Sequence, residues 1–135
     1  MADTRAVIQK FIDHVNAGQF AEAFSLLNED GRYIVIGKTG ASGVYNGRKE
    51  LFEKLLPALA TFKVPPALKF GDVIVEGNKG AFRASGKGVG PTGDYDQPYY
   101  MWYVRVEGDG FAEMIEHLDT VQIETAVFGK KLVDA

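Results

Sequence analysis

The chain has 135 residues, of which 46% are hydrophobic and 24% are charged, and its net charge is -3 at pH 7. These values are typical of a soluble globular protein with one hydrophobic core, and we expect a single domain over residues 1–135. No run of Lys or Arg exceeds two residues, so we expect no nucleic-acid partner and no polybasic contact with a membrane. The absence of cysteine excludes disulfides and thiolate chemistry.

The N-terminal residues lack the charged and then apolar pattern of a signal peptide. No apolar stretch approaches the about 20 residues that a helix needs to cross a bilayer. We therefore expect a cytoplasmic protein.

Three helices are predicted in the first half of the chain. Apolar residues from Val7 to Val15 recur at helical spacing and predict a first helix that ends at residues 16–18. A short second helix is expected over residues 20–27, and a short strand over residues 32–36. A loop at residues 38–47 leads to a third helix over residues 48–61, which should kink or change character at Pro57.

Strands dominate the second half. They are predicted over residues 68–76, 81–87, 99–107 and 111–123, with turns at Gly77-Asn78 and Gly108-Asp109-Gly110. Residues 88–98 are rich in Gly and Pro and predict a loop that is long enough to form a rim or lid. Helices followed by antiparallel strands indicate an α+β fold, with helices on one face of a curved sheet that can close into a cone around a ligand cavity.

Asp119 stands out within the last predicted strand. A period of two places Ile115, His117, Asp119 and Val121 on one face of this strand. Aspartate is disfavoured in strands, so this carboxylate is expected either in a pocket that uses it or at a frayed strand end that faces water.

The order of these motifs resembles the SnoaL-like group of the superfamily that contains nuclear transport factor 2 and ketosteroid isomerase. The resemblance rests on the order of elements along the chain. Two helices and a strand come first, followed by Tyr45-Asn46-Gly47-Arg48 and a third helix, and the last strands contain residues 110–113 and 116–120. It implies a cone-shaped α+β domain with three helices in its N-terminal half and a deep pocket between helices and sheet. Such domains are usually dimeric through the outer face of the sheet, so a homodimer is expected.

Different members of this superfamily use different acids. The general-base Asp of ketosteroid isomerases corresponds to a position near Ile36, where no carboxylate stands. Limonene epoxide hydrolases use an Arg-x-Asp motif and a second Asp on the last strand. Here Arg83 and Asp119 match, but Ser85 replaces the first carboxylate, which leaves a two-carboxylate mechanism incomplete.

SnoaL-like polyketide cyclases rely on an acid/base Asp on the last strand, and Asp119 matches that position. If the sheet curls as the resemblance implies, Asp119 approaches Arg83. The guanidinium of Arg83 would then lower the pKa of Asp119 and orient the substrate. The alternative is a structural ion pair without chemistry. His117 is a candidate second proton carrier or a structural histidine.

The expected ligand-binding residues are mostly aromatic. Tyr100 and Trp102 share a strand face that should line the pocket, or else simply fill the core. Tyr33, Phe11 and Phe52 are expected in the core or the pocket wall, and Ser85 beside Arg83.

Two functions are compatible with this pattern. The first is a small cofactor-independent enzyme of isomerase, cyclase or hydrolase type that moves protons on a hydrophobic small molecule. The second is a non-catalytic module for ligand binding or dimerisation. Two distant histidines without a carboxylate cluster give no reason to expect a metal site.

Overall fold

The computed structural model describes residues 3–135. Helix α1 spans Thr4–Asn16 and begins at Asp3, whose side chain accepts a hydrogen bond from the backbone N–H of Ala6 at 3.3 Å. Its apolar stripe is buried, as the sequence predicted. Helix α2 spans Phe20–Phe24 and is shorter than predicted because Leu27 already begins the first strand.

The third helical region runs through three consecutive segments. These are α3 (Arg48–Glu50), the π-helical η1 (Leu51–Leu55) and α4 (Leu56–Ala60). Pro57 lies in the first turn of α4 and has no N–H to donate to the preceding turn. The wider π-helical turn lies directly before it, which confirms the predicted change of character.

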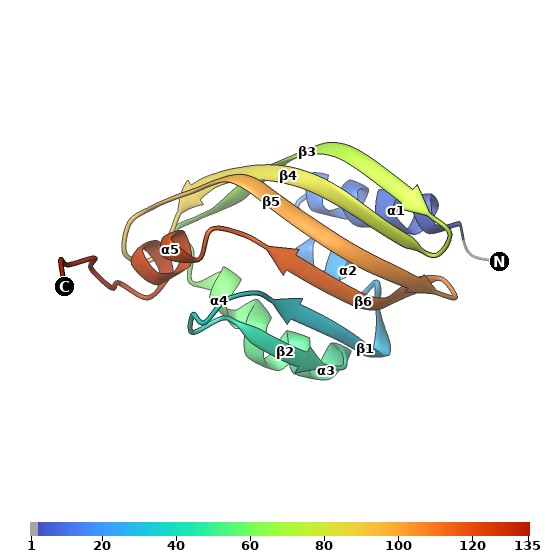
Figure 1. Ribbon diagram of the computed structural model, residues 1–135, viewed down its shortest axis with the longest axis horizontal. Coiled ribbons are helices and arrows are strands. Elements are labelled where there is room, and N and C mark those ends of the chain that lie inside the picture. Colours follow the sequence, from blue (N-terminus) through green and yellow to red (C-terminus); the bar gives the residue numbers. More distant parts are fainter. Residues whose placement is uncertain (1–2) are drawn as a thin grey trace.

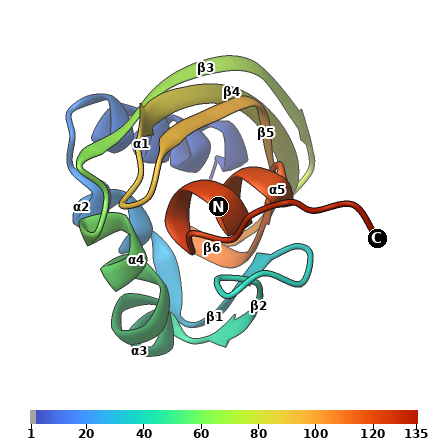
Figure 2. The same ribbon diagram turned by 90° about the vertical axis from the view of Figure 1, so that its left-hand side faces the viewer.

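One six-stranded sheet forms the rest of the framework (Figure 1). Its strands are β1 (Leu27–Val35), β2 (Gly43–Asn46), β3 (Val64–Glu76), β4 (Lys79–Val89), β5 (Asp94–Glu107) and β6 (Gly110–His117). They lie in the order β2-β1-β6-β5-β4-β3, and every pairing is antiparallel except that of β1 with β6. The sheet curls without closing, and helices α1 to α4 lie along its concave side (Figure 2). The predicted α+β fold is confirmed.

Two sequence predictions for the sheet were wrong. Residues 88–98 form no long loop, because Asp94–Pro98 belong to β5 and pair with β4, for example Gln97 with Gly86. Strand β3 begins at Val64 and includes Pro65 and Pro66. Proline is tolerated there because β3 is an edge strand, so that missing N–H groups can face away from the ladder.

The predicted last strand is also too long. Strand β6 ends at His117, and the chain then forms a C-terminal helix made of α5 (Thr120–Gln122) and the π-helical η2 (Ile123–Val127). Asp119 is the N-cap of this helix, since its Oδ1 accepts the backbone N–H of Val121 at 2.9 Å. The helix lies across one end of the curled sheet (Figure 2).

Aromatic rings fill the core between the sheet and α1. The ring of Phe11 lies at the centre of this cluster and contacts Phe24, Phe70, Phe82, Trp102 and Phe111 at centroid distances of 5.7 to 6.4 Å. Within residues 3–135, none of the helices combines the length and apolarity that crossing a bilayer requires.

Candidate functional site

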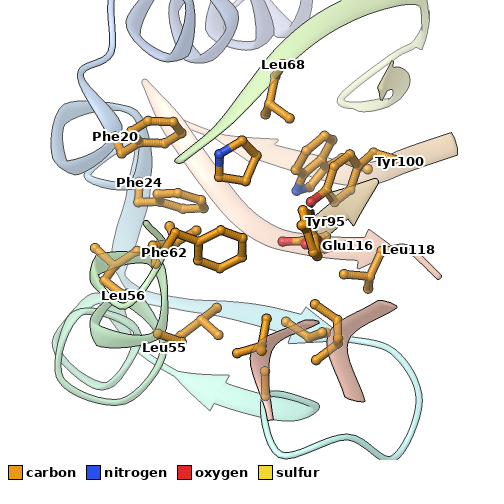
Figure 3. A pocket seen from close by; sticks show the side chains of 18 residues that line it. Phe20, Phe24, Leu55, Leu56, Phe62, Leu68, Tyr95, Tyr100, Glu116 and Leu118 are labelled. Atoms are coloured by element: carbon orange, nitrogen blue, oxygen red, sulfur yellow. Dashed lines mark hydrogen bonds between the residues drawn. The ribbon is translucent and has the colours of Figure 1, made fainter. Parts of the chain in front are cut away.

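A pocket of about 90 Å³ lies between the concave face of the sheet and the helices (Figure 3). The helical side of its wall is apolar and includes Phe20, Phe24, Leu55, Leu56 and Phe62. The sheet side contributes Leu68, Tyr95, Tyr100, Trp102, Glu116 and Leu118. The pocket is therefore a hydrophobic cavity with a few polar groups on one side, the usual character of a small-molecule site.

Among residues 3–135, Glu116 is the one carboxylate in the wall of this pocket. It belongs to β6, where Met114 and Glu116 alternate with residues that face outward, and Leu118 follows directly after the strand. The hydroxyl of Tyr33 donates a hydrogen bond to Glu116 Oε1, and Trp102 Nε1 donates to the Tyr33 hydroxyl oxygen at 2.9 Å. Both supporting residues are buried, so this chain of hydrogen bonds fixes the carboxyl group in one orientation.

The surroundings of Glu116 change its acidity. Burial raises the pKa of Glu116 from 4.5 to about 7, while the hydrogen bond from Tyr33 acts in the opposite direction. Figure 3 shows the carboxyl group pointing into the pocket. Within residues 3–135, Oε1 accepts the Tyr33 bond, and Oε2 makes no hydrogen bond. The group can therefore accept or release a proton near neutral pH, and one of its oxygens is free for a ligand.

A second polar feature is the pair Tyr95 and Tyr100. Their hydroxyl oxygens are 2.5 Å apart, and both side chains are buried in the pocket wall. Burial raises the pKa of both hydroxyls, so both remain protonated at neutral pH. Tyr100 stacks on Trp102 at a centroid distance of 5.2 Å, and Tyr95 meets the edge of Phe62 at 5.0 Å. The pair presents polar hydrogen atoms within an otherwise aromatic wall.

The C-terminal helix completes the pocket with Ile123 and Val127. A fully buried side chain, Gln97, holds the junction between β6 and this helix. Gln97 Nε2 donates to the carbonyl of Asp119 at 2.9 Å, and the Asp119 N–H donates to Gln97 Oε1 at 2.8 Å. At the other end, the Thr92 hydroxyl donates to the carbonyl of Ala126 at 2.8 Å. The pocket wall thus depends on polar contacts outside the pocket.

The prediction that Asp119 faces the pocket beside Arg83 was wrong. Asp119 is exposed and caps α5. Arg83 lies on the outer face of the sheet, where its Nη2 is 3.5 Å from Asp72 Oδ2 and the two side chains are 54% and 80% exposed. The predicted Arg83–Asp119 pair does not form, because Arg83 lies on the other face of β4 from the pocket and Asp119 lies beyond the end of β6.

His117 and Ser85 also lie away from the pocket. The pairing register places Arg83, Met101 and His117 in one row on the outer face, and the Nδ1 of His117 is 3.3 Å from the carbonyl oxygen of Met101. Ser85 lies with Arg83 beside a shallow hollow on the same outer face. The error was one of parity, since the inward-facing residue of β6 is Glu116, next to His117.

The predictions for the aromatic residues agree better with the structure than those for Asp119, Arg83 and His117. Tyr100 and Trp102 line the pocket, as expected from their strand face. Tyr33 lies behind Glu116 and contacts it, although it forms no part of the pocket wall. Phe11 is buried in the core, and Phe52 is partly buried against it, so neither residue lines the pocket.

The sequence reading missed Glu116, Tyr95 and Gln97. Glu116 carried a signal, because it stands between Met114 and Leu118 on the same strand face. Tyr95 and Gln97 were hidden by the prediction of a loop at residues 88–98. Within residues 3–135 no three side chains of the metal-binding types come together.

No protein-family model matches this sequence, and no curated protein matches it. Solved structures match its fold. A protein of unknown function from Burkholderia pseudomallei K96243, described as NTF2-like, has a TM-score of 0.79 at 13% identity, over 94% of this chain and 98% of that one. A provisionally assigned SnoaL-like polyketide cyclase from Jannaschia sp. CCS1 has a TM-score of 0.74 at 16% identity, over 95% and 93%.

A third similar structure is an epoxide hydrolase of the LEH-like type from M. tuberculosis. Its TM-score is 0.68 at 10% identity, over 93% of this chain and 89% of that chain. At such identities the likeness concerns architecture, and function has to be argued from the site. The curled six-stranded sheet, its helices and these matches show that the chain has the nuclear transport factor 2-like fold.

Proposed function

We propose that the protein is a small enzyme of isomerase, cyclase or hydrolase type in which Glu116 transfers a proton to or from a hydrophobic small molecule. The observation that carries the proposal is a carboxyl group with a pKa of about 7, fixed by Tyr33, with an unpaired oxygen in an apolar pocket. General acid–base catalysis of this kind contributes about 10²–10⁴-fold to a rate.

Tyr33 and Trp102 are positioning residues in this proposal. The Tyr33 hydroxyl donates to Glu116 Oε1, and Trp102 Nε1 restrains the Tyr33 hydroxyl in turn. Neither bond occupies Glu116 Oε2, which can therefore approach a ligand C–H or O–H group. The chemistry as proposed uses this chain's own side chains alone.

The pocket favours a reaction that needs one carboxylate. In the described part of the chain, residues 3–135, Glu116 is the only Asp or Glu that lines it. A mechanism with one carboxylate to activate water and another to protonate an opening epoxide would lack its second acid here. Enolisation followed by reprotonation needs a single base that returns its proton, so isomerisation or cyclisation is favoured over epoxide hydrolysis.

Deuterium exchange tests the proposed chemistry. Small aryl ketones in D₂O would be incubated with the protein, and loss of the α-hydrogen signal would be followed by NMR. We expect exchange that becomes faster as pH rises through about 7, and a loss of about 100-fold or more in Glu116→Gln. The matched control is Glu113→Gln, on the same strand but ion-paired to Arg32 on the outer face. Equal exchange by wild type and Glu116→Gln would contradict the proposal.

A binding function without chemistry is the second candidate. The apolar wall of the pocket supports it, because a hydrophobic molecule can bind there without transfer of a proton. Saturable binding of a ketone with no exchange above the solvent rate would identify this function instead.

We also propose that two copies associate through the outer face of the sheet. Cross-strand register aligns one apolar or aromatic residue from each strand there: Ile74, Ala81, Tyr103, Ile115, Ile34 and Val44. The row spans the whole sheet, and its ends are open to solvent, with Ile74 68% and Val44 47% exposed. An uninterrupted apolar row of this kind is a self-complementary surface for a two-fold dimer.

Light scattering coupled to size-exclusion chromatography tests the dimer. We expect the wild-type mass to be twice that of the chain, and Ile115→Lys in the middle of the row to give a monomer. Leu132→Lys is the control, because Leu132 is exposed in the C-terminal segment, where it shares a surface hollow with Lys38 and Thr39. A monomeric wild type would contradict this proposal. A cytoplasmic location stays a prediction of the sequence.

A further inference from the structure

A shallow hollow lies on the outer face of the sheet, where two β-bulges flank strand β4. On one side, the two residues 71–72 of β3 stand opposite one residue of β4, Arg83. On the other side, the two residues 98–99 of β5 stand opposite Ser85. Each bulge bends its strand and re-aims the side chains around it. The two bends make this end of the outer face concave, and residues from all three strands line it.

The lining of the hollow is rich in hydrogen-bond donors. Within residues 3–135 it contains two cations, Lys69 and Arg83, and no Asp or Glu. The hydroxyls of Ser85 and Tyr99 complete the set. Lys69 and Ser85 are cross-strand partners, so their side chains are neighbours. Gly71 adds no side chain to the floor, and Arg83 Nη2 lies 3.9 Å from the position that a Cβ atom would take there.

These donors are largely available to a ligand. Among residues 3–135, Lys69 forms no ion pair. The single acidic contact of Arg83 in that range is with Asp72, at 3.5 Å, and the Asp72 side chain is 80% exposed. An exposed pair of this kind contributes little to stability, so another anion can replace Asp72 beside the guanidinium.

The donor set suits a phosphate group better than a carboxylate. A phosphate monoester carries a charge of about −1.5 to −2 near pH 7 and three acceptor oxygens. It can therefore bind the planar fork of Arg83 and the ammonium group of Lys69 at the same time. A carboxylate has one charge and two oxygens. The ring of Tyr99, which is 78% exposed, can contact an apolar group attached to the phosphate.

The overall charge of the chain favours a small ligand in solution over a lipid headgroup. The net charge is -3, and no run of Lys or Arg exceeds two residues. An anionic membrane would repel such a chain as a whole. A small phosphate ester that enters the hollow lies closest to the two cations, because more distant charges are screened by salt.

We propose that the hollow binds the phosphate group of a small phosphate monoester between Arg83 and Lys69. The site lies on the face of the sheet opposite Glu116, so it does not depend on the proposed acid–base function. It is also separate from the proposed dimer surface, because none of its lining residues belongs to the apolar row, which crosses β4 at Ala81.

NMR titration of the full chain tests the ligand class. Phenyl phosphate, benzoate and benzyl alcohol would be added at constant ionic strength, and the backbone amide signals of Gly71, Ser85 and Tyr99 would be followed. We expect saturable shifts with phenyl phosphate, binding of benzoate that is weaker by about 3-fold or more, and no shift of these signals with benzyl alcohol. Benzoate binding as tight as that of phenyl phosphate would overturn the proposal, and so would the absence of saturable shifts at these amides.

Vesicles of phosphatidylcholine with phosphatidic acid test the source of the phosphate group. We expect the protein to remain in the supernatant when they are sedimented at about 0.15 M salt. Co-sedimentation that Arg83→Gln abolishes would assign the hollow to a lipid headgroup and overturn the small-molecule ligand.

Variants test the contacts, with opposite signs expected for two neighbouring residues. Arg83→Gln should weaken binding of phenyl phosphate about 3–10-fold. Asp72→Asn should strengthen it about 2–5-fold, because it removes the carboxylate that competes for Arg83. The matched control is Lys79→Gln, which removes the same charge from the exposed face of β4 outside the hollow and should leave binding unchanged.

Equal weakening by Lys79→Gln and Arg83→Gln would show a general attraction to the cationic surface and would overturn the site. Weaker binding by Asp72→Asn would contradict the competition with Arg83. All three side chains are exposed, so we expect the variants to fold, and thermal unfolding checks this.

Discussion

The two faces of strand β6 carry glutamates in opposite situations. Glu113, on the outer face, forms an ion pair with Arg32, whose side chain is 53% exposed. Glu116, on the inner face, is held by the hydroxyl of Tyr33, and no Lys, Arg or His from residues 3–135 lines the pocket beside it. The same side chain is therefore a surface ion-pair partner at one position and a group that titrates near pH 7 at the other. Glu116 is a candidate acid/base group because an apolar wall surrounds it and no cation lies beside it.

The largest contrast between the two faces is expected in stability, at neighbouring residues of β4. Phe82 is fully buried and stacks on Trp102, whereas Arg83 makes only an exposed ion pair with Asp72. We expect Phe82→Ala to lower the free energy of unfolding by about 3–5 kcal/mol. Arg83→Ala should change it by less than about 0.5 kcal/mol. Urea unfolding measures both free energies, and similar losses of stability in the two variants would contradict this difference between the faces.

A smaller effect is expected in the pH dependence of stability. The pKa of Glu116 is raised from 4.5 to about 7 in the folded protein, so the folded state binds the proton more tightly than the unfolded state. The contribution of this group is fully present below pH 4.5 and is lost as pH rises through 7. Glu116→Gln should remove this loss, which amounts to roughly 3 kcal/mol. The free energy of unfolding would be measured against pH for both proteins. A difference between wild type and variant that stays constant from pH 4 to 8 would contradict the account.

The inner face also depends on Gln97, which ties β5 to the start of the C-terminal helix. Gln97→Ala would leave the N–H and the carbonyl of Asp119, whose hydrogen bonds to Gln97 are partly buried, without their partners. We expect a loss of about 1–3 kcal/mol in urea unfolding. Asp96→Ala, at the exposed neighbouring position, is the control. Hydrogen exchange should become faster in α5 and η2 of Gln97→Ala, and unchanged exchange would show that Gln97 does not hold the helix.

The smallest change in stability is expected for substitutions of Asp119. Because this residue caps α5, Asp119→Ala should lower stability by about 1 kcal/mol, whereas Asp119→Asn keeps a capping oxygen and should change it little. Both variants should retain deuterium exchange. An Asp119→Asn protein that folds normally but loses exchange would restore this residue to a catalytic role.

Sequence patterning predicted the helices, the hairpin at Gly108–Gly110 and the inward face of β5, because these follow from local periodicity and turn chemistry. It missed the C-terminal helix because Asp119, a residue disfavoured in strands, was assigned to a strand, although Asp119-Thr120 is also a helix start.

The inward face of β6 was harder to predict. Apolar residues stand on both of its faces, Met114 inside and Ile115 outside, so alternation alone does not fix its orientation. The register also shifts at a bulge between Arg105 and Val106, which breaks the simple count from the neighbouring strand. The pocket combines Glu116 with Phe62 and Ile123, residues that only the fold brings together.

The most direct test is a titration of the Glu116 carboxyl group. Carbon-13 NMR of protein labelled at the glutamate side-chain carboxyl, with Glu116→Gln to assign the signal, would follow its ionisation from pH 4 to 9. The account predicts a midpoint of about 7. A midpoint near 4.5, the ordinary value for glutamate, would show that the pocket does not isolate this group and would contradict the central claim.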